Sequence, residues 1–108
     1  MSTQSHYRIK YSTLSFYDLQ DIHFEEYIAN VSKYPEVALE QIYRITEEIR
    51  ELEFFPKIHA VRKTDSKNRE ICAFPVNNYS VLYSVDEREQ VVNILRVLYG
   101  RRNIDALP

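Results

Sequence analysis

The sequence is nearly without cysteine and glycine, and it contains no tryptophan. Its 108 residues include one cysteine, Cys72, and one glycine, Gly100. A single cysteine excludes an internal disulfide and a cysteine-rich zinc site, and a single glycine excludes a glycine-rich phosphate-binding loop. Cys72 lies in an apolar stretch, so we expect it to be a small buried residue.

Long apolar segments and paired metal ligands are also missing. No apolar run approaches the ~20 residues that span a bilayer, and residues 1–6 lack the basic start and apolar stretch of a signal peptide. His6, His23 and His59 are not spaced at i,i+3 or i,i+4 from one another or from Cys72. We therefore predict no membrane contact, no metal and no other cofactor, and a cytoplasmic location. The length suits one domain, residues 1–108, with 1–6 as a flexible tail.

The two halves of the chain carry opposite charge. Residues 1–56 hold five basic and ten acidic side chains, whereas residues 57–108 hold nine basic and six acidic ones. This asymmetry predicts one face for a polyanion or an acidic partner. Because the whole chain has a net charge of −2, we expect no direct sequence-specific DNA binding by this chain alone.

Apolar periodicity predicts an α+β fold with the order β-α-α-β-β-β-β. Ser12 or Thr13 is expected to cap the first helix, Pro56 follows the second, and the Asn77-Asn78 pair supplies a hairpin turn. A helix hairpin should pack on one face of a mainly antiparallel sheet. The predicted strands cover 7–11, 60–63, 69–76, 79–85 and 91–99, and the predicted helices cover 14–31 and 36–52.

The first predicted helix has apolar residues on two sides. Leu19 and Ile22 lie on one side, and Leu14, Tyr17, Phe24 and Ile28 form a second stripe roughly opposite. A helix of this kind is usually buried on both sides, which is the interpretation we favour for this one. The alternative is that the second stripe faces a partner chain.

The stretch 91–103 predicts an interior strand that ends at Gly100 and is followed by two arginines. It delivers Tyr99, Arg101 and Arg102 to one rim of the sheet, either as a solvated turn or as a target-binding surface. RNA cleavage would need an acid, a base and cations beside the phosphate. Basic side chains and Tyr99 could supply part of such a site, with Lys63 and Glu70 on neighbouring strands.

The chain resembles the RelE/ParE toxins of bacterial type II toxin–antitoxin modules. The resemblance covers roughly residues 7–104. It rests on the element order and on these stretches: Tyr11-Ser12, Asp18-Leu19, Phe55-Pro56, Arg69-Glu70, Asn78-Tyr79 and Leu95-Arg96-Val97-Leu98-Tyr99-Gly100-Arg101-Arg102. Tyr99 stands where ParE-like members often have histidine, and Asn103 stands where they often have aspartate.

The resemblance implies a toxin that is neutralised by a cognate antitoxin. ParE-like members inhibit DNA gyrase without known catalytic residues, and this chain would use Arg96, Tyr99, Arg101 and Arg102 to bind its target. RelE-like members cut mRNA on the ribosome, which would assign Arg69, Tyr99 and Arg102 as catalytic residues. Ile71, Ala73 and Ser80 stand where those nucleases tend to place cations, so the ParE-like mechanism is favoured. A non-toxic antitoxin-binding module is a third alternative. We expect the antitoxin to cover Leu14, Tyr17, Phe24 and Ile28.

Overall fold

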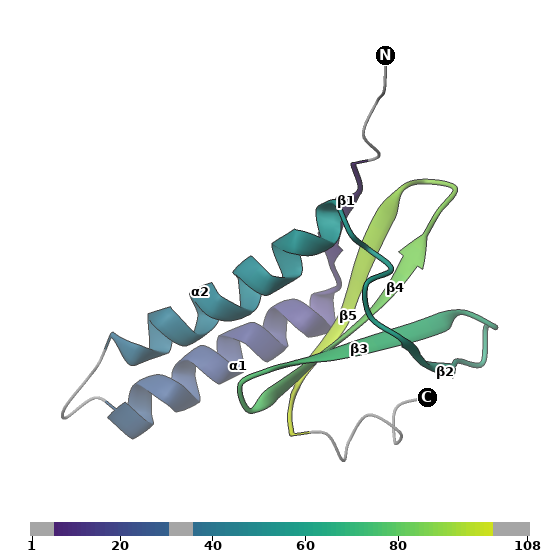
Figure 1. Cartoon of the computed structure of the whole chain (residues 1–108). Helices are drawn as coiled ribbons and strands as arrows, with labels where there is room; N and C mark the ends of the chain where they lie inside the picture. The colour runs from purple at the N-terminus through teal and green to yellow at the C-terminus, as the bar shows by residue number, and fades with distance from the viewer. Residues whose placement is uncertain (1–5, 31–35, 101–108) are drawn as a thin grey trace.

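Two helices lie side by side against one face of a five-stranded sheet (Figure 1). The computed structural model describes residues 6–30 and 36–100. The predicted α+β order is confirmed. The elements are β1 (Arg8–Tyr11), α1 (Thr13–Asn30), α2 (Val37–Arg50), a 3-10 turn η1 (Glu51–Glu53), β2 (Val61–Thr64), β3 (Glu70–Val76), β4 (Tyr79–Asp86) and β5 (Val91–Tyr99).

The strand order is β1-β5-β4-β3-β2, so β5 is an interior strand as predicted. β1 runs parallel to β5, and the other neighbouring pairs are antiparallel. The hairpin turn between β3 and β4 uses Asn77 at φ 53°, a left-handed conformation that asparagine tolerates. The segment joining the helices, which includes Pro35, lies outside the described residues.

The main core lies between the helices and the sheet. Side chains alternate across a strand, so alternate residues of β3, β4 and β5 face the helices. Ile45 and Ile49 of α2 are fully buried there with Tyr83, Val92 and Ile94 of the sheet. Cys72 is buried in the same core, as predicted. The opposite face of the sheet carries a smaller apolar cluster around Ile71 and Leu82.

The preferred interpretation of α1, burial on both sides, is wrong. Leu19 and Ile22 pack into the core, but Leu14, Tyr17, Phe24 and Ile28 are 57%, 54%, 65% and 56% exposed. We call these four residues the α1 ridge. The chain is too small to supply a second layer, so only one side of this helix meets the sheet and α2. No helix in the described part of the chain is long and apolar enough to cross a membrane.

Candidate functional site

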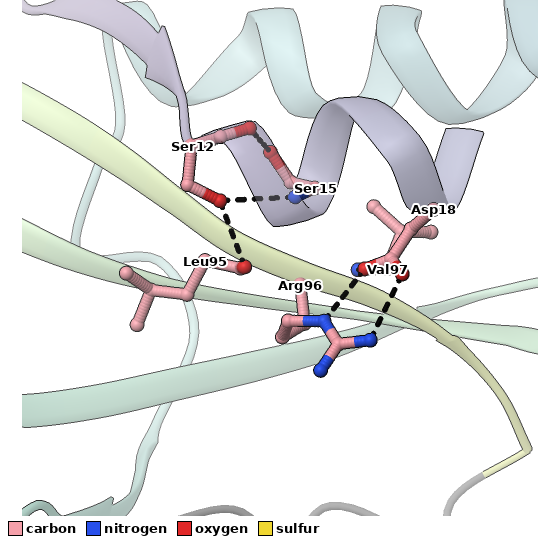
Figure 2. A network of polar contacts seen from close by, with 6 residues as sticks. All are labelled: Ser12, Ser15, Asp18, Leu95, Arg96 and Val97. Carbon is pink, nitrogen blue, oxygen red and sulfur yellow. Dashed lines mark hydrogen bonds and ion pairs between the residues drawn. The ribbon is translucent and has the colours of Figure 1, made fainter. Parts of the chain in front are cut away.

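An irregularity in β5 shapes the surface beside the start of α1. Leu82 pairs with Arg96 and Tyr83 pairs with Ile94, which leaves Leu95 without a partner in β4. The Leu95 carbonyl instead accepts a hydrogen bond of 3.0 Å from Ser12 Oγ (Figure 2). Ser12 Oγ also accepts the backbone N–H of Ser15 at 3.0 Å. Ser12, one of the two residues predicted for this role, is therefore the N-cap of α1. Its hydrogen bond to the Leu95 carbonyl also connects the start of the helix to the bulge.

Arg96 is held by a carboxylate from α1 (Figure 2). Its Nε and Nη2 donate to Asp18 Oδ2 at 2.8 Å and to Asp18 Oδ1 at 2.9 Å. The Val97 N–H donates to Asp18 Oδ2 at 2.9 Å. This pairing raises the pKa of Arg96. The Asp18 side chain is 12% exposed and the Arg96 side chain is 28% exposed, so the cation is the more accessible partner.

A hollow of about 310 Å³ opens next to Arg96 on the sheet face that the helices leave uncovered. We call it the sheet-face hollow. Its apolar lining comes from the start of α1 and from three strands, and Lys63, Arg69 and Arg96 place cations around it. None of the residues that line it is aromatic. They are Ser12, Leu14, Lys63, Asp65, Arg69, Ile71, Leu82, Leu95 and Arg96.

The β2–β3 turn fixes Arg69 at this hollow. Arg69 Nε donates to Asp65 Oδ2 at 2.7 Å. The backbone N–H groups of Arg69 and Lys67 donate to Asp65 Oδ1 at 2.8 and 2.9 Å. These bonds, led by the Arg69 N–H, lower the pKa of the Asp65 carboxyl. Only 5% of the Asp65 side chain is exposed, against 48% of Arg69, so the guanidinium covers its carboxylate.

Tyr99 lies at a different place, where β5 ends beside the β3–β4 turn. Its ring is 64% exposed and meets Tyr79 edge-on, with ring centroids 5.6 Å apart. Gly100 closes this end of the strand at φ 77°, and its N–H donates to the Asn78 carbonyl at 2.7 Å. Together these residues line a smaller hollow of about 220 Å³. Tyr79 itself donates to Glu26 Oε2 at 2.7 Å, and burial raises the pKa of Tyr79.

The structure does not bring Arg69 and Tyr99 together. Arg69 precedes the first residue of β3, whereas Tyr99 is beside Tyr79, which pairs with Val76 at the other end of β3. The seven residues of β3, Glu70–Val76, separate them by about 20 Å along the strand. Arg101 and Arg102 lie outside the described residues. Of the predicted target-binding set, Arg96 lines the sheet-face hollow and Tyr99 lines the smaller one.

The α1 ridge is predicted to bind a partner, and the structure leaves it open to solvent. Leu14 also lines the sheet-face hollow, so the ridge and the hollow meet at this residue. Phe16 and Tyr27 of the same helix are exposed as well, at 54% and 43%. Such a set of apolar side chains on one helix is typical of a protein-binding surface.

Sequence reasoning missed Asp18, Asp65 and Leu95 as parts of this site. Asp65 had a local signal, because aspartate at the start of a polar turn often binds backbone N–H groups two residues on. Asp18 and Leu95 had no local signal in the sequence. The role of Asp18 depends on how α1 packs on β5, and that of Leu95 depends on the register between β4 and β5. Among the described residues, no group of three or more His, Cys, Asp or Glu could hold a metal ion.

Comparisons with known proteins point to one family. A family model described as the ParE toxin of the type II toxin–antitoxin system parDE matches residues 7–104. No curated protein sequence matches the chain. Among solved structures, a chain of the chromosomal ParDE system from P. aeruginosa is similar at 20% identity and a TM-score of 0.68. The similarity covers 90% of this chain and 99% of that one.

Two further structures share the fold. A chain of the archaeal RelE–RelB complex from Pyrococcus horikoshii has 21% identity and a TM-score of 0.61, covering 90% of this chain and 98% of that one. A chain of a RelBE toxin–antitoxin complex from Mycobacterium tuberculosis has 18% identity and a TM-score of 0.55, covering 87% and 98%. At these identities the structures support the fold.

Proposed function

Since the chain belongs to the ParE toxin family of type II toxin–antitoxin systems, we propose that it inhibits growth by binding DNA gyrase rather than by cutting RNA. The family match spans nearly the whole described chain, and it agrees with the resemblance stated from the sequence. The proposal is of an inhibitor that occupies a surface on its target. It assigns that role to Tyr99, Arg101 and Arg102.

The chemistry of the open sheet face supports an inhibitor over a nuclease. Ile71 and Ala73 belong to an apolar cluster there with Leu82, where phosphate binding would need cations. Arg69 and Tyr99 also lie too far apart to act on one phosphate, because a catalytic group must come within hydrogen-bond reach of the reacting atoms.

The partner that we propose for the α1 ridge is the cognate antitoxin. The similar solved structures are described as ParDE, RelE–RelB and RelBE systems or complexes. An amphipathic or disordered antitoxin segment would gain affinity by burying Tyr17, Phe24 and Ile28, which are otherwise in water. Burial of so many exposed apolar side chains would also keep the toxin from associating non-specifically.

One experiment separates the two mechanisms. The chain is expressed without its antitoxin, and plasmid supercoiling and mRNA integrity are measured in the same culture. Relaxed or cleaved plasmid with intact messages is the expected result. Cut messages with normal supercoiling would instead establish a nuclease, and growth without either effect would establish a non-toxic module.

The double substitution of Arg101 and Arg102 by alanine tests the proposed target-binding rim. We expect loss of growth inhibition with an unchanged circular dichroism spectrum, because the core residues of the described chain all lie between Tyr7 and Leu98. The matched control replaces Lys67 and Arg88, two exposed cations in the β2–β3 and β4–β5 turns. Full toxicity of the Arg101/Arg102 variant would contradict the assignment.

A further inference from the structure

We propose that the sheet-face hollow is a docking site for an acidic peptide segment that places an aliphatic side chain beside a carboxylate. The hollow would hold a part of the antitoxin separate from the part on the α1 ridge. The inference rests on the proposed function only in naming the antitoxin as the owner of that segment. The chemistry of the site can be tested without the antitoxin.

The floor of the hollow selects for an aliphatic side chain. Ile71 and Leu82 are nearly fully buried at its base, and Leu14 and Leu95 complete its apolar lining. Bases of single-stranded nucleic acids are bound by stacking on aromatic rings. The lining has no aromatic ring, so an apolar amino-acid side chain fits this surface better than a nucleotide.

The rim selects for a carboxylate. Arg69 and Arg96 are each oriented by a partly buried carboxylate, of Asp65 and of Asp18, whose side chain is less exposed than the cation it holds. A partner approaching the hollow therefore meets guanidinium groups first. Because both side chains are already fixed, a second carboxylate can bind them with little further loss of side-chain entropy.

Continuity with the α1 ridge argues that the segment belongs to the same partner. Leu14 is at the start of α1, belongs to the ridge and lines the hollow. A chain that leaves the ridge at Leu14 enters the hollow without crossing any other surface. One partner could thus bind the acidic half of the toxin through apolar contacts and the basic half through its own acidic residues.

The test uses the full chain labelled with ¹⁵N and short peptides as probes. The first peptide has leucine flanked by glutamates, the second has leucine flanked by lysines, and the third has serine flanked by glutamates. A short oligouridylate is the fourth probe. We expect the first peptide to shift the amide resonances of Lys63, Ile71 and Leu82 in a saturable way, and the other three to bind at least about fivefold more weakly.

Two substitutions of equal charge change locate the binding. Lys63→Glu, on the rim, should weaken binding of the first peptide about fivefold. Arg62→Glu is the matched control, because Arg62 is the exposed neighbouring residue of β2 and does not line the hollow. If Lys63→Glu alters the spectrum of the free protein, the exposed ridge residue Leu14→Ser replaces it, with the same expected loss.

Several outcomes would overturn the inference. These are no shifts at the hollow, equal binding of the lysine or serine peptide, tighter binding of the oligouridylate, or equal losses for Lys63→Glu and Arg62→Glu. Failure of the proposed function would look different. It would leave peptide binding intact while plasmid supercoiling and growth stayed normal in cells that express the chain.

Discussion

At the scale of single residues, Asp18 and Arg96 decide how α1 is attached to the sheet. The Asp18 carboxylate accepts two bonds from the Arg96 guanidinium and one from the Val97 N–H. The Asp18 side chain thus binds both a cation and a backbone N–H of β5 that lies past the last residue paired with β1. The sequence alone suggested Arg96 as a target-binding residue, and its pairing assigns it first to the internal structure.

The substitution Asp18→Asn should lower the free energy of unfolding by about 1–3 kcal/mol, because it weakens three hydrogen bonds in a partly buried site. Urea denaturation followed by circular dichroism measures the change. Asp21→Asn is the control, since Asp21 is an exposed aspartate of the same helix, and it should change stability by less than about 0.5 kcal/mol. Equal stability of the two variants would show that the network contributes nothing.

At the scale of elements, the two helices differ in what their outer surfaces offer. α2 buries Ala38, Ile45 and Ile49. Its outer surface is mainly charged, with two exposed large apolar side chains, Leu39 and Tyr43. α1 buries Ile22 and leaves a ridge of apolar side chains outside. A helix with this second apolar side is stable in the monomer only because its first side is well packed, and its outer side is available for a partner.

Phe24→Asp should weaken antitoxin binding about thirtyfold, as expected for an aromatic residue at the centre of an interface. The stability of the free toxin should barely change, because the ring is already 65% exposed. Titration calorimetry with the neutralising antitoxin measures the loss. Phe55→Asp is a matched control, with a ring 64% exposed outside the ridge. Similar losses for both variants would rule out a specific role for the ridge.

The helices and strands could be predicted from the sequence, but the contacts between them could not. Apolar residues alternate along a strand and recur at a fixed spacing along a helix, and both patterns are local. The sequence therefore predicts β5 and both helices to within a few residues of their observed bounds. The bulge at Leu95 depends on the register between β4 and β5, which no local pattern encodes. Burial of the α1 ridge was wrongly favoured because periodicity shows that a stripe is apolar without showing what covers it.

At the scale of the whole molecule, one core on the helix side of the sheet carries most of the apolar burial. The loop after η1 closes one end of this core. There His59 stacks on Phe74 with ring centroids 4.3 Å apart and planes 8° apart. The Tyr83 side chain extends from this core to the same loop, where its hydroxyl donates a hydrogen bond of 2.8 Å to the Pro56 carbonyl. Global stability therefore depends in part on how the His59 ring packs against Phe74 and Tyr83.

Burial lowers the pKa of His59 below 6.5, although the carboxylates of Glu48 and Glu51 oppose the shift. The folded state then binds fewer protons at this site than the unfolded state, so stability should fall as the pH drops through about 6.5. The fall continues until His59 is protonated in the folded state as well. His59→Gln should reduce the difference in unfolding free energy between about pH 7.5 and 5.5. If the variant shows the same difference in unfolding free energy as the original chain, protonation of His59 does not cause the loss of stability.

The parallel pairing of β1 with β5 determines when the protein can become active during its own synthesis. β1 leaves the ribosome before the other described strands, but β5, the strand beside it in the sheet, is the last of them to emerge. The nascent chain cannot complete its sheet until Val91–Tyr99 has been translated, and only then do the bulge, Tyr99 and the end of the core exist. A cell therefore makes all five described strands before it holds a folded toxin. The α1 ridge, which we propose as the antitoxin surface, is also held in place only then, because Asp18 of that helix is bonded to Arg96 and Val97 of β5.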